Sequence, residues 1–351
     1  MAPYGYGVIG CGWASVGHAV GAVSLRDKDV DLVAVADADA DRLASVADRF
    51  DVSHRYTDFN ELLERDDIDA VSICVPDYLH HDVAIAAMRA GKHVLCEKPL
   101  AMNTAQVHSM IRTAQETGAA LSVVFNHRYR PAHRRLYLAA RAGGFGRLLI
   151  GYVFHSSEVR ANPGIPSTWR KRADRVGGGV LTMQTVHFLD ILMWALGEPV
   201  QRVRCATANR NHPDEQVEDV GAVIVEFESG ALVTVAATNA SPMDDLTRLE
   251  LHGTDGYAVL EGYEIQQWKA AAAYQEPPLG LPEIELDPAL AAQLFFGPGH
   301  VLQVTEFIQD MRSGKPPAVP AQVGLDTVAV LEAAYESSRT GATVVIDSAR
   351  G

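Results

Sequence analysis

The fold of this chain is decided near its N-terminus, where residues 6–15 read Y-G-V-I-G-C-G-W-A-S. A short apolar run is followed at once by two glycines and then by a stretch of helical character. This order predicts a strand, a glycine turn and a helix. In such a unit Gly10 allows the tight turn, Gly12 lets the backbone approach a pyrophosphate, and the first N–H groups of the helix bind phosphate. Ser15 replaces the third glycine of the usual dinucleotide-binding fingerprint, which we expect to loosen helix–strand packing slightly.

An acidic residue follows the second predicted strand. Residues 31–36 form an apolar run, typical of a buried parallel strand, that leads into Asp37. Asp37 lies 25 residues after Gly12, about where an acid binds the adenosine ribose hydroxyls of a dinucleotide. Asp39 adds a negative charge that would repel a 2′-phosphate, so NAD is favoured over NADP. The alternative is that Asp37 and Asp39 only cap the next helix.

Strands and helices alternate through the first third of the chain. Apolar runs at residues 70–75, 94–96 and 121–125 are separated by helical patterns. The alternation predicts βαβ units, a parallel sheet and right-handed crossovers. Ligands bind at the carboxyl ends of such strands. Four residues that no packing argument requires are predicted at those ends, namely Gly10, Asp37, Pro76 and Lys98.

Composition excludes several classes of protein. The 351 residues suit about two domains. No apolar run approaches the ~20 residues that span a bilayer, and the N-terminus lacks a basic segment and a cleavable apolar segment, so we expect a cytoplasmic protein. The formal net charge of −14 argues against nucleic acid and anionic membrane as partners. The scattered cysteines predict buried, reduced thiols rather than disulfides or a zinc site; they are Cys11, Cys74, Cys96 and Cys205.

The pattern changes after residue 125. Strand-like runs joined by the turns at 228–230 and 254–256 predict antiparallel hairpins. A triple-glycine turn at 177–179 opens a helix predicted over residues 180–196, with Gln184 and His187 on one face. The long polar segment at 156–176 carries a group of cations, for which a solvated surface is the favoured interpretation and an anionic substrate the alternative. That group consists of Arg160, Lys171, Arg172 and Arg175.

Taken together, these residues resemble the Gfo/Idh/MocA family, the glucose–fructose oxidoreductase and inositol dehydrogenase group of nicotinamide-dependent enzymes. The resemblance rests on Val8–Gly12, Val75–His80, Glu97–Leu100, Gly177–Leu181 and His187–Asp190. It implies an α/β protein with an N-terminal Rossmann domain and parallel sheet over residues 1–125. A C-terminal substrate-binding domain with a large, open, mostly antiparallel sheet is implied over residues 126–351. The outer face of that sheet is expected to form a homodimer or homotetramer.

The resemblance also implies roles for individual residues. Lys98 corresponds to the E-K-P lysine beside nicotinamide and substrate oxygen, and His187 to the general acid/base. The implied cofactor contacts are Gly10, Gly12, Trp13, Asp37, Pro76, His80, Glu97, Lys98, Trp169 and Arg170. The implied substrate contacts are Arg128, Tyr129, Gln184 and His187, and no metal is implied. A domain-interface ion pair is the alternative for Arg128. Met183 stands where most of the family has an aspartate, whereas Gln184 fits a version seen in some members.

The predicted function is that of an NAD-dependent dehydrogenase acting on CH–OH groups. It moves a hydride between nicotinamide and a secondary hydroxyl or keto carbon of a sugar, glycoside or cyclitol. Three alternatives stay open. They are a keto-sugar or nucleotide-sugar reductase that uses NADPH, a redox-cycling lyase or glycosidase that retains its NAD, and a non-catalytic NAD-binding regulator. The presence of both Lys98 and His187 argues against the regulator.

Overall fold

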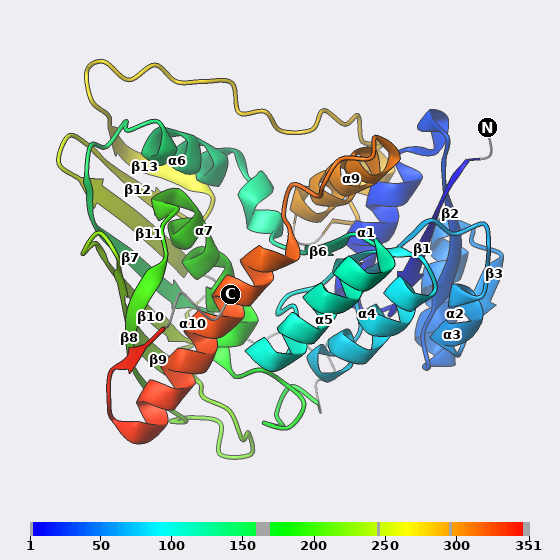
Figure 1. Ribbon diagram of the computed structural model, residues 1–351, viewed down its shortest axis with the longest axis horizontal. Coiled ribbons are helices and arrows are strands. Elements are labelled where there is room, and N and C mark those ends of the chain that lie inside the picture. Colours follow the sequence, from blue (N-terminus) through cyan, green and yellow to red (C-terminus); the bar gives the residue numbers. More distant parts are fainter. Residues whose placement is uncertain (1–2, 159–168, 244–245, 295–296, 347–351) are drawn as a thin grey trace. The chain divides into compact units, whose positions relative to one another are not determined.

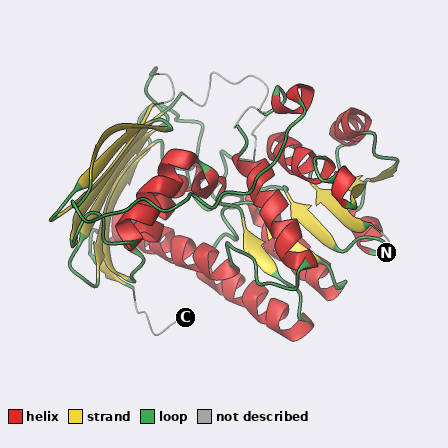
Figure 2. Cartoon of the chain, turned by 90° about the horizontal axis from the view of Figure 1, so that it is seen from above, coloured by secondary structure: helices red, strands yellow, loops and turns green. Residues whose placement is uncertain are grey.

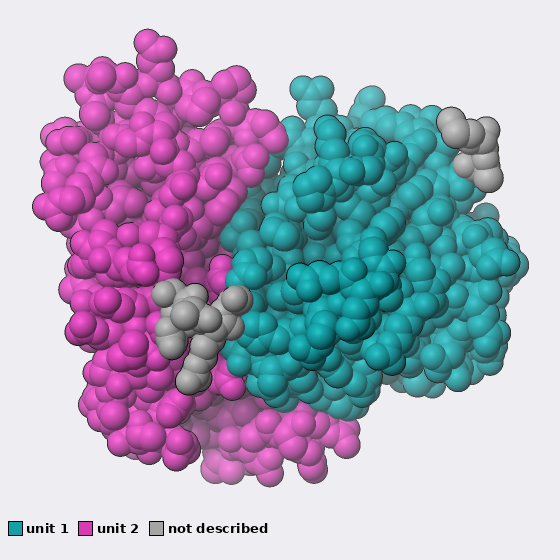
Figure 3. Space-filling view, viewed as in Figure 1, with its two compact units in different colours: residues 1–129, 281–325 teal, residues 130–280, 326–351 magenta. Residues whose placement is uncertain are grey.

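The computed structural model describes residues 3–158, 169–243, 246–294 and 297–346. The chain forms two compact units, coloured separately in Figure 3. The first unit contains residues 1–129 and 281–325, and the second contains residues 130–280 and 326–351. This division differs from the predicted domains, because residues 281–325 join the N-terminal unit. The reason is that apolar side chains of helix α9 (Gly299–Arg312), such as Val304 and Phe307, enter its core.

The first unit is built on a six-stranded parallel sheet with the order β3-β2-β1-β4-β5-β6 (Figure 1). All of its strand pairs are parallel, as the sequence predicted. Every residue of the central strand β4 is buried, as expected for a strand with helices on both faces. The strands are β1 (Tyr4–Ile9), β2 (Val30–Ala36), β3 (His54–Tyr56), β4 (Ala70–Ile73), β5 (His93–Cys96) and β6 (Leu121–Val123).

Two helices of the first unit, α1 (Trp13–Val23) and α9, pack closely against each other. A Cβ atom added to Gly21 would lie 2.7 Å from the Cβ of Val304, and one on Gly17 would lie 2.8 Å from the Cβ of His300. Glycine at both positions therefore lets α9 dock on α1. The other helices are η1 (Arg26–Lys28), α2 (Ala40–Phe50), α3 (Phe59–Leu63), η2 (Asp77–Leu79), α4 (His80–Arg89), α5 (Thr104–Thr117), η3 (Asn126–Tyr129) and α8 (Pro288–Ala291).

The second unit contains an eight-stranded sheet with the order β13-β12-β11-β7-β10-β9-β8-β14. Only the β7–β10 pair is parallel among its described neighbours, so the prediction of a large, mostly antiparallel sheet is confirmed. Its strands are β7 (Leu148–Ser156), β8 (Val200–Ala208), β9 (Val220–Phe227), β10 (Leu232–Thr238), β11 (Leu246–Gly253), β12 (Tyr257–Glu261), β13 (Glu264–Lys269) and β14 (Val344–Val345).

Helices cover one face of this second sheet, as Figures 1 and 2 show. They are α6 (Pro131–Arg141), η5 (Leu181–Thr185), α7 (Val186–Leu196) and α10 (Ala321–Thr340). A Cβ atom on Gly151 of β7 would lie 3.0 Å from Leu192, which shows how closely α7 packs on the strand. Ile150 of the same strand points to the opposite face and is exposed, whereas Tyr152 and Phe154 on that face are half-buried. No described helix combines the length and the apolar character needed to cross a membrane.

The helix predicted over residues 180–196 is not continuous. Residues Leu181–Thr185 form a π-helix, and the α-helix begins at Val186. The hydroxyl of Thr185 donates to the carbonyl of Val180, 2.9 Å away. A π-helix closes its hydrogen bonds over five residues instead of four, so regular α-helical spacing does not hold over residues 181–185. Such segments occur often at functional sites.

Candidate active site

The glycine turn between β1 and α1 has the predicted form. Gly10 has φ of +94°, and a Cβ atom there would lie 2.5 Å from the carbonyl of Cys74, so glycine is required twice over. Around Gly12, no other described residue comes within 4 Å of the position of a Cβ atom, outside its chain neighbours. Ser15 is buried and donates to the carbonyl of Gly12 at 2.6 Å. The turn thus packs against Cys74 at Gly10 and is open at Gly12. Trp13 begins α1 next to it, with an exposed side chain.

Asp37 lies at the carboxyl end of β2 and holds this turn. Its Oδ2 accepts a hydrogen bond from the N–H of Cys11 at 2.7 Å, and its Oδ1 accepts one from the N–H of Asp39 at 2.8 Å. Asp39 caps α2, because its carboxylate accepts the N–H groups of Asp41 and Arg42. The capping alternative is therefore correct for Asp39, whereas Asp37 faces the glycine turn.

His80 links the end of strand β4 to the lysine loop. Its Nδ1 lies 2.7 Å from the carbonyl oxygen of Pro99, and its Nε2 lies 2.9 Å from that of Val75. The side chain starts α4 and is 1% exposed. Burial alone would lower the pKa of His80, but Cys96, Asp77 and the Pro99 carbonyl raise it to about 10. Both ring nitrogens are thus taken by the main chain, in a residue predicted to contact the cofactor.

Glu97 lies in a buried cluster that the sequence analysis missed. Its Oε1 is 3.0 Å from Nε2 of His18 and 3.2 Å from Nε2 of His300. Its Oε2 accepts the N–H of Lys98 at 3.2 Å. Burial would raise the pKa of Glu97, yet the two imidazoles hold it well below its usual range. Glu97 is therefore an ionised carboxylate that fixes the backbone beside the half-buried Lys98.

The same cluster extends into the sheet. His18 Nδ1 lies 2.6 Å from the hydroxyl of Ser72, which lies 2.6 Å from the hydroxyl of Tyr6. Burial lowers the pKa of His18 although Glu97 acts in the opposite direction, which favours a neutral ring that donates from Nε2 to Glu97. The metal-binding atoms of His18, Glu97 and His300 lie within 4.8 Å of one another, and hydrogen bonds account for this spacing. No motif in the sequence marks either histidine, because each reaches Glu97 only through the docking of α1 and α9.

Arg128 and Tyr129 lie buried in η3, after the last parallel strand. The phenol of Tyr129 donates to Glu306 in α9. The guanidinium carbon of Arg128 lies 5.8 Å from the centre of the Phe125 ring. The structure therefore connects both residues to the first unit, and their predicted substrate contacts stay predictions.

In the second unit, Glu218 anchors the triple-glycine turn. Its Oε2 accepts the N–H of Gly179 at 2.7 Å, and its Oε1 accepts the N–H of Leu181 at 3.1 Å and the hydroxyl of Tyr335 at 2.8 Å. A Cβ atom on Gly178 would lie 1.8 Å from the Tyr335 hydroxyl, and one on Gly179 would lie 1.9 Å from the Glu218 carbonyl. Burial raises the pKa of Glu218, although the hydrogen bonds from these donors act to lower it. The sequence analysis missed this anchor as well.

The π-helix carries Gln184, and α7 begins just before His187. The amide of Gln184 donates to the hydroxyl of Ser157 at 3.0 Å, while its Oε1 is buried without a partner among the described residues. His187 is half-buried in the first turn of α7. Trp169 and Arg170 precede the glycine turn, and their side chains stack with the guanidinium carbon 4.6 Å from the ring centre.

The cations near this turn form surface ion pairs. Lys171 lies 2.5 Å from Asp214, and Arg172 lies 2.9 Å from Asp174, with these side chains 41–59% exposed. This pairing agrees with a solvated surface, which the sequence analysis favoured. Arg160 lies outside the described residues.

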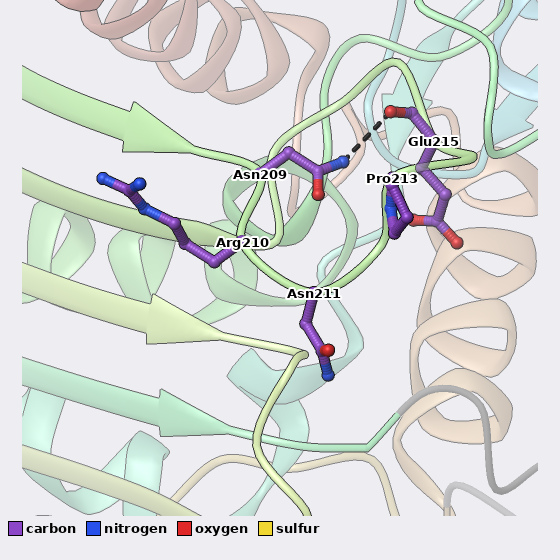
Figure 4. Close-up of a pocket in the computed structure, with 5 residues that line it drawn as sticks. All are labelled: Asn209, Arg210, Asn211, Pro213 and Glu215. Atoms are coloured by element: carbon purple, nitrogen blue, oxygen red, sulfur yellow. Dashed lines mark hydrogen bonds between the residues drawn. The ribbon is translucent and has the colours of Figure 1, made fainter.

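A surface hollow lies beside the turn after β8 and contains none of the predicted site residues (Figure 4). The buried carboxylate of Asp219 shapes the turn by accepting the N–H groups of Arg210, Asn211 and His212. Asn209 adds a hydrogen bond to the carbonyl of Glu215 at 3.0 Å. The hollow is lined by Asn209, Arg210, Asn211, Pro213 and Glu215.

The fold and the glycine turn define a dinucleotide-binding protein of the Rossmann class, since the strand order reverses beside β1, where the turn lies. Comparison with known proteins agrees. The family described as "Oxidoreductase family, NAD-binding Rossmann fold" matches residues 4–125, and the Gfo/Idh/MocA C-terminal domain matches residues 133–259. The chain therefore belongs to the Gfo/Idh/MocA oxidoreductase family.

Similar proteins include enzymes named for sugar and cyclitol substrates. A 1,5-anhydro-D-fructose reductase of Ensifer adhaerens is 30% identical and covers 81% of this chain and 83% of its own. A myo-inositol 2-dehydrogenase of Thermotoga maritima is 27% identical over 98% of this chain and 99% of its own. The solved WlbA dehydrogenase of Bordetella pertussis, in complex with NADH and UDP-GlcNAcA, is 25% identical, with a TM-score of 0.85 over 99% of this chain and 98% of that one.

The ionised state of Glu97 predicts how stability depends on pH. The folded pKa lies well below the ordinary value of 4.5, so the folded protein binds this proton less readily than the unfolded chain. The stabilisation is present above pH 4.5 and is lost as pH falls through the folded pKa. We expect Glu97→Gln to lower the free energy of unfolding by about 2 kcal/mol at neutral pH. The difference in unfolding free energy between the variant and the native protein should narrow as pH falls below 4.5.

Urea unfolding followed by tryptophan fluorescence measures this difference across the pH range. The matched control is Glu116→Gln, which removes an exposed carboxyl from α5 and should leave the curve unchanged. A loss for Glu97→Gln that stays constant with pH would contradict an ionised Glu97.

Proposed function

We propose that the protein is an NAD-dependent dehydrogenase of a secondary alcohol on a sugar, glycoside or cyclitol. The observation that carries the proposal is the lysine loop at the carboxyl edge of the parallel sheet. Buried bonds hold this loop on both sides of Lys98, through Glu97 and through the carbonyl of Pro99. The named substrates of the relatives support the class of substrate.

The proposed chemistry divides the work between Lys98 and His187. When bound, nicotinamide supplies the acceptor for the hydride that leaves the carbinol carbon. His187 takes the hydroxyl proton as general base, so that the alcohol becomes a ketone. Lys98 donates a hydrogen bond to the same oxygen and stabilises its developing negative charge. In the reverse direction the same groups return the proton.

NAD is the proposed cofactor in preference to NADP. The residues present fit a dinucleotide, since Gly12 leaves open space and Asp37 presents a carboxylate at the end of β2. Arg42 could pair with a 2′-phosphate, but its guanidinium already lies 3.3 Å from Asp37 and 3.5 Å from Asp39. The two carboxylates leave a net negative charge around Arg42, which favours binding of ribose hydroxyls over binding of a 2′-phosphate.

A nucleotide sugar is the second candidate substrate. The similarity to an enzyme solved with UDP-GlcNAcA favours it. The pairing of Lys171 and Arg172 with nearby aspartates counts against it, because those cations are already neutralised.

A substrate screen tests the proposed class. Inositols, aldoses, glycosides and UDP-GlcNAcA are each incubated with the protein and either NAD or NADP, and reduced cofactor is followed by absorbance. We expect NADH formation with at least one neutral polyol. We also expect NADP to be slower by at least about tenfold, because like charges in contact cost several kcal/mol. Preference for NADP would overturn the argument from Asp37.

The role of Lys98 is tested by Lys98→Met, which removes the amino group and keeps much of the side-chain volume. We expect kcat/KM to fall by about 10²- to 10³-fold, because an electrostatic donor to the reacting oxygen is lost. Affinity for NADH, measured by fluorescence titration, should stay the same. The control is Lys315→Met at an exposed lysine after α9. Full turnover by Lys98→Met with normal NADH binding would refute the mechanism.

We also propose a homo-oligomer formed through the open face of the second sheet. Ile150, Ile224 and Leu232 point to this face and are 44%, 48% and 40% exposed. Leu232 pairs directly with Ile150, so the apolar side chains are neighbours. Light scattering should show that Ile224→Glu lowers the molecular mass in solution, because a charge would have to be buried. Met243→Glu, at another exposed apolar residue, should not; an unchanged mass for Ile224→Glu would refute this interface.

A further inference from the structure

We propose that His80 is a buried imidazolium, protonated throughout the neutral pH range, that positions the lysine loop. The protonation state follows from the contacts of the ring. Its consequence for catalysis rests on the proposed function of Lys98. His80 is thus a positioning residue that carries a fixed charge.

The two partners of the ring require two donors. Both ring nitrogens face main-chain carbonyl oxygens, at 2.7 Å for Pro99 and 2.9 Å for Val75. A carbonyl oxygen can only accept, whereas a neutral imidazole has one N–H and one lone pair. In a neutral ring one lone pair would therefore face an oxygen at hydrogen-bond distance. Turning the ring by half a turn would place carbon atoms at both positions and lose both bonds. The side chain of Cys96 is a third hydrogen-bond partner of the ring. The doubly protonated form is the one that donates to both carbonyl oxygens.

The surroundings can hold this charge. A buried cation is costly unless it is paired, and the groups that act on His80 are Asp77 of η2 and Cys96 of β5. Together with the Pro99 carbonyl they outweigh burial and raise the pKa of His80 to about 10. Asp77 is itself buried, so its charge is poorly screened by water. The buried cation therefore has a counter-charge in the segment that immediately precedes it.

His18 shows that burial beside the same sheet does not by itself produce a charged histidine. It is buried as deeply as His80, but its Nδ1 meets the hydroxyl of Ser72, which can donate as well as accept. A neutral ring satisfies that arrangement, and burial lowers the pKa of His18. The difference between the two histidines lies in their partners. His80 meets two carbonyl oxygens and the Cys96 side chain, whereas His18 meets a hydroxyl and a carboxylate.

The imidazolium of His80 acts on Lys98, the residue that precedes its hydrogen-bond partner Pro99. Pro99 follows Lys98 directly, so the bond from His80 fixes the loop on one side while Glu97 fixes it on the other. A nearby positive charge disfavours the ammonium form of Lys98 and favours the neutral amine, which can still donate a hydrogen bond to the substrate oxygen. Glu97 acts in the opposite sense, but its charge is shared with the N–H groups of His18 and His300.

The protonation state can be measured without substrate. The full chain, labelled with 15N at its 13 histidines, gives a pair of ring-nitrogen signals for each of them. At about pH 8, where ordinary histidines are neutral, one pair should still show both nitrogens protonated. That pair should disappear in His80→Gln. If every histidine of the native protein has a non-protonated ring nitrogen at this pH, the proposal is wrong. This result is obtained on the native protein, so it does not depend on whether a variant folds.

Kinetics test the consequence for Lys98. His80→Gln should lower kcat by about 10- to 100-fold, because the loop is less well placed. Loss of the charge should move the acid limb of the pH–rate profile upward by on the order of one unit. His81→Gln is the matched control, since His81 pairs with Asp82 near the surface and should leave the profile unchanged. A folded His80→Gln that binds NADH and keeps the native profile overturns the charge role.

The two experiments separate failure of this proposal from failure of the proposed function. If the native protein turns over no polyol with either cofactor, the proposed function fails while the nitrogen signals still decide the state of His80. If the protein oxidises a polyol and all its histidines are neutral at about pH 8, the proposal of a charged His80 is wrong and the proposed dehydrogenase activity is retained.

Discussion

The burial of one carboxylate, that of Glu97, constrains much of the first unit. An ionised carboxylate away from water needs several donors, and here they come from α1, from α9 and from the N–H of Lys98. Helix α9 must therefore dock on α1 although the two are far apart in sequence. Gly17 and Gly21 make that approach possible. After strand β13 of the second sheet, the chain thus returns to the first unit and completes the environment of the lysine loop.

A second buried carboxylate has the corresponding role in the other unit. Glu218 receives two main-chain N–H groups and a phenol, and it fixes the turn from which the π-helix and His187 follow. The two carboxylates differ in electrostatic environment. Two imidazoles hold the pKa of Glu97 down, whereas burial outweighs the donors of Glu218 and raises its pKa. In both cases the carboxylate fixes the backbone close to a predicted catalytic residue without being that residue.

Local patterns predicted what depends on neighbours in sequence. The turn at Gly10, the capping role of Asp39 and both hairpins follow from spacing within a few residues, and the structure confirms them. The cluster around Glu97 could not be predicted, because His300 reaches it only after the chain has passed through strands β7–β13 of the second sheet. The π-helix was missed because the helix after it is apolar on nearly all sides, so the one-residue shift that a wide turn causes cannot be seen in the pattern.

His80 illustrates how a correct motif can suggest an incomplete role. The motif placed it at the edge where ligands bind, and a ligand contact was the natural prediction. The structure uses both of its nitrogens within the protein. Asp37 is a similar case, since the carboxylate that is expected to bind ribose also accepts a hydrogen bond from the N–H of Cys11. Such internal bonds fix the edge before any ligand arrives, so that reorganisation on binding is small. A site residue in this fold is therefore better assigned from the partners of each of its polar atoms than from its place in a motif.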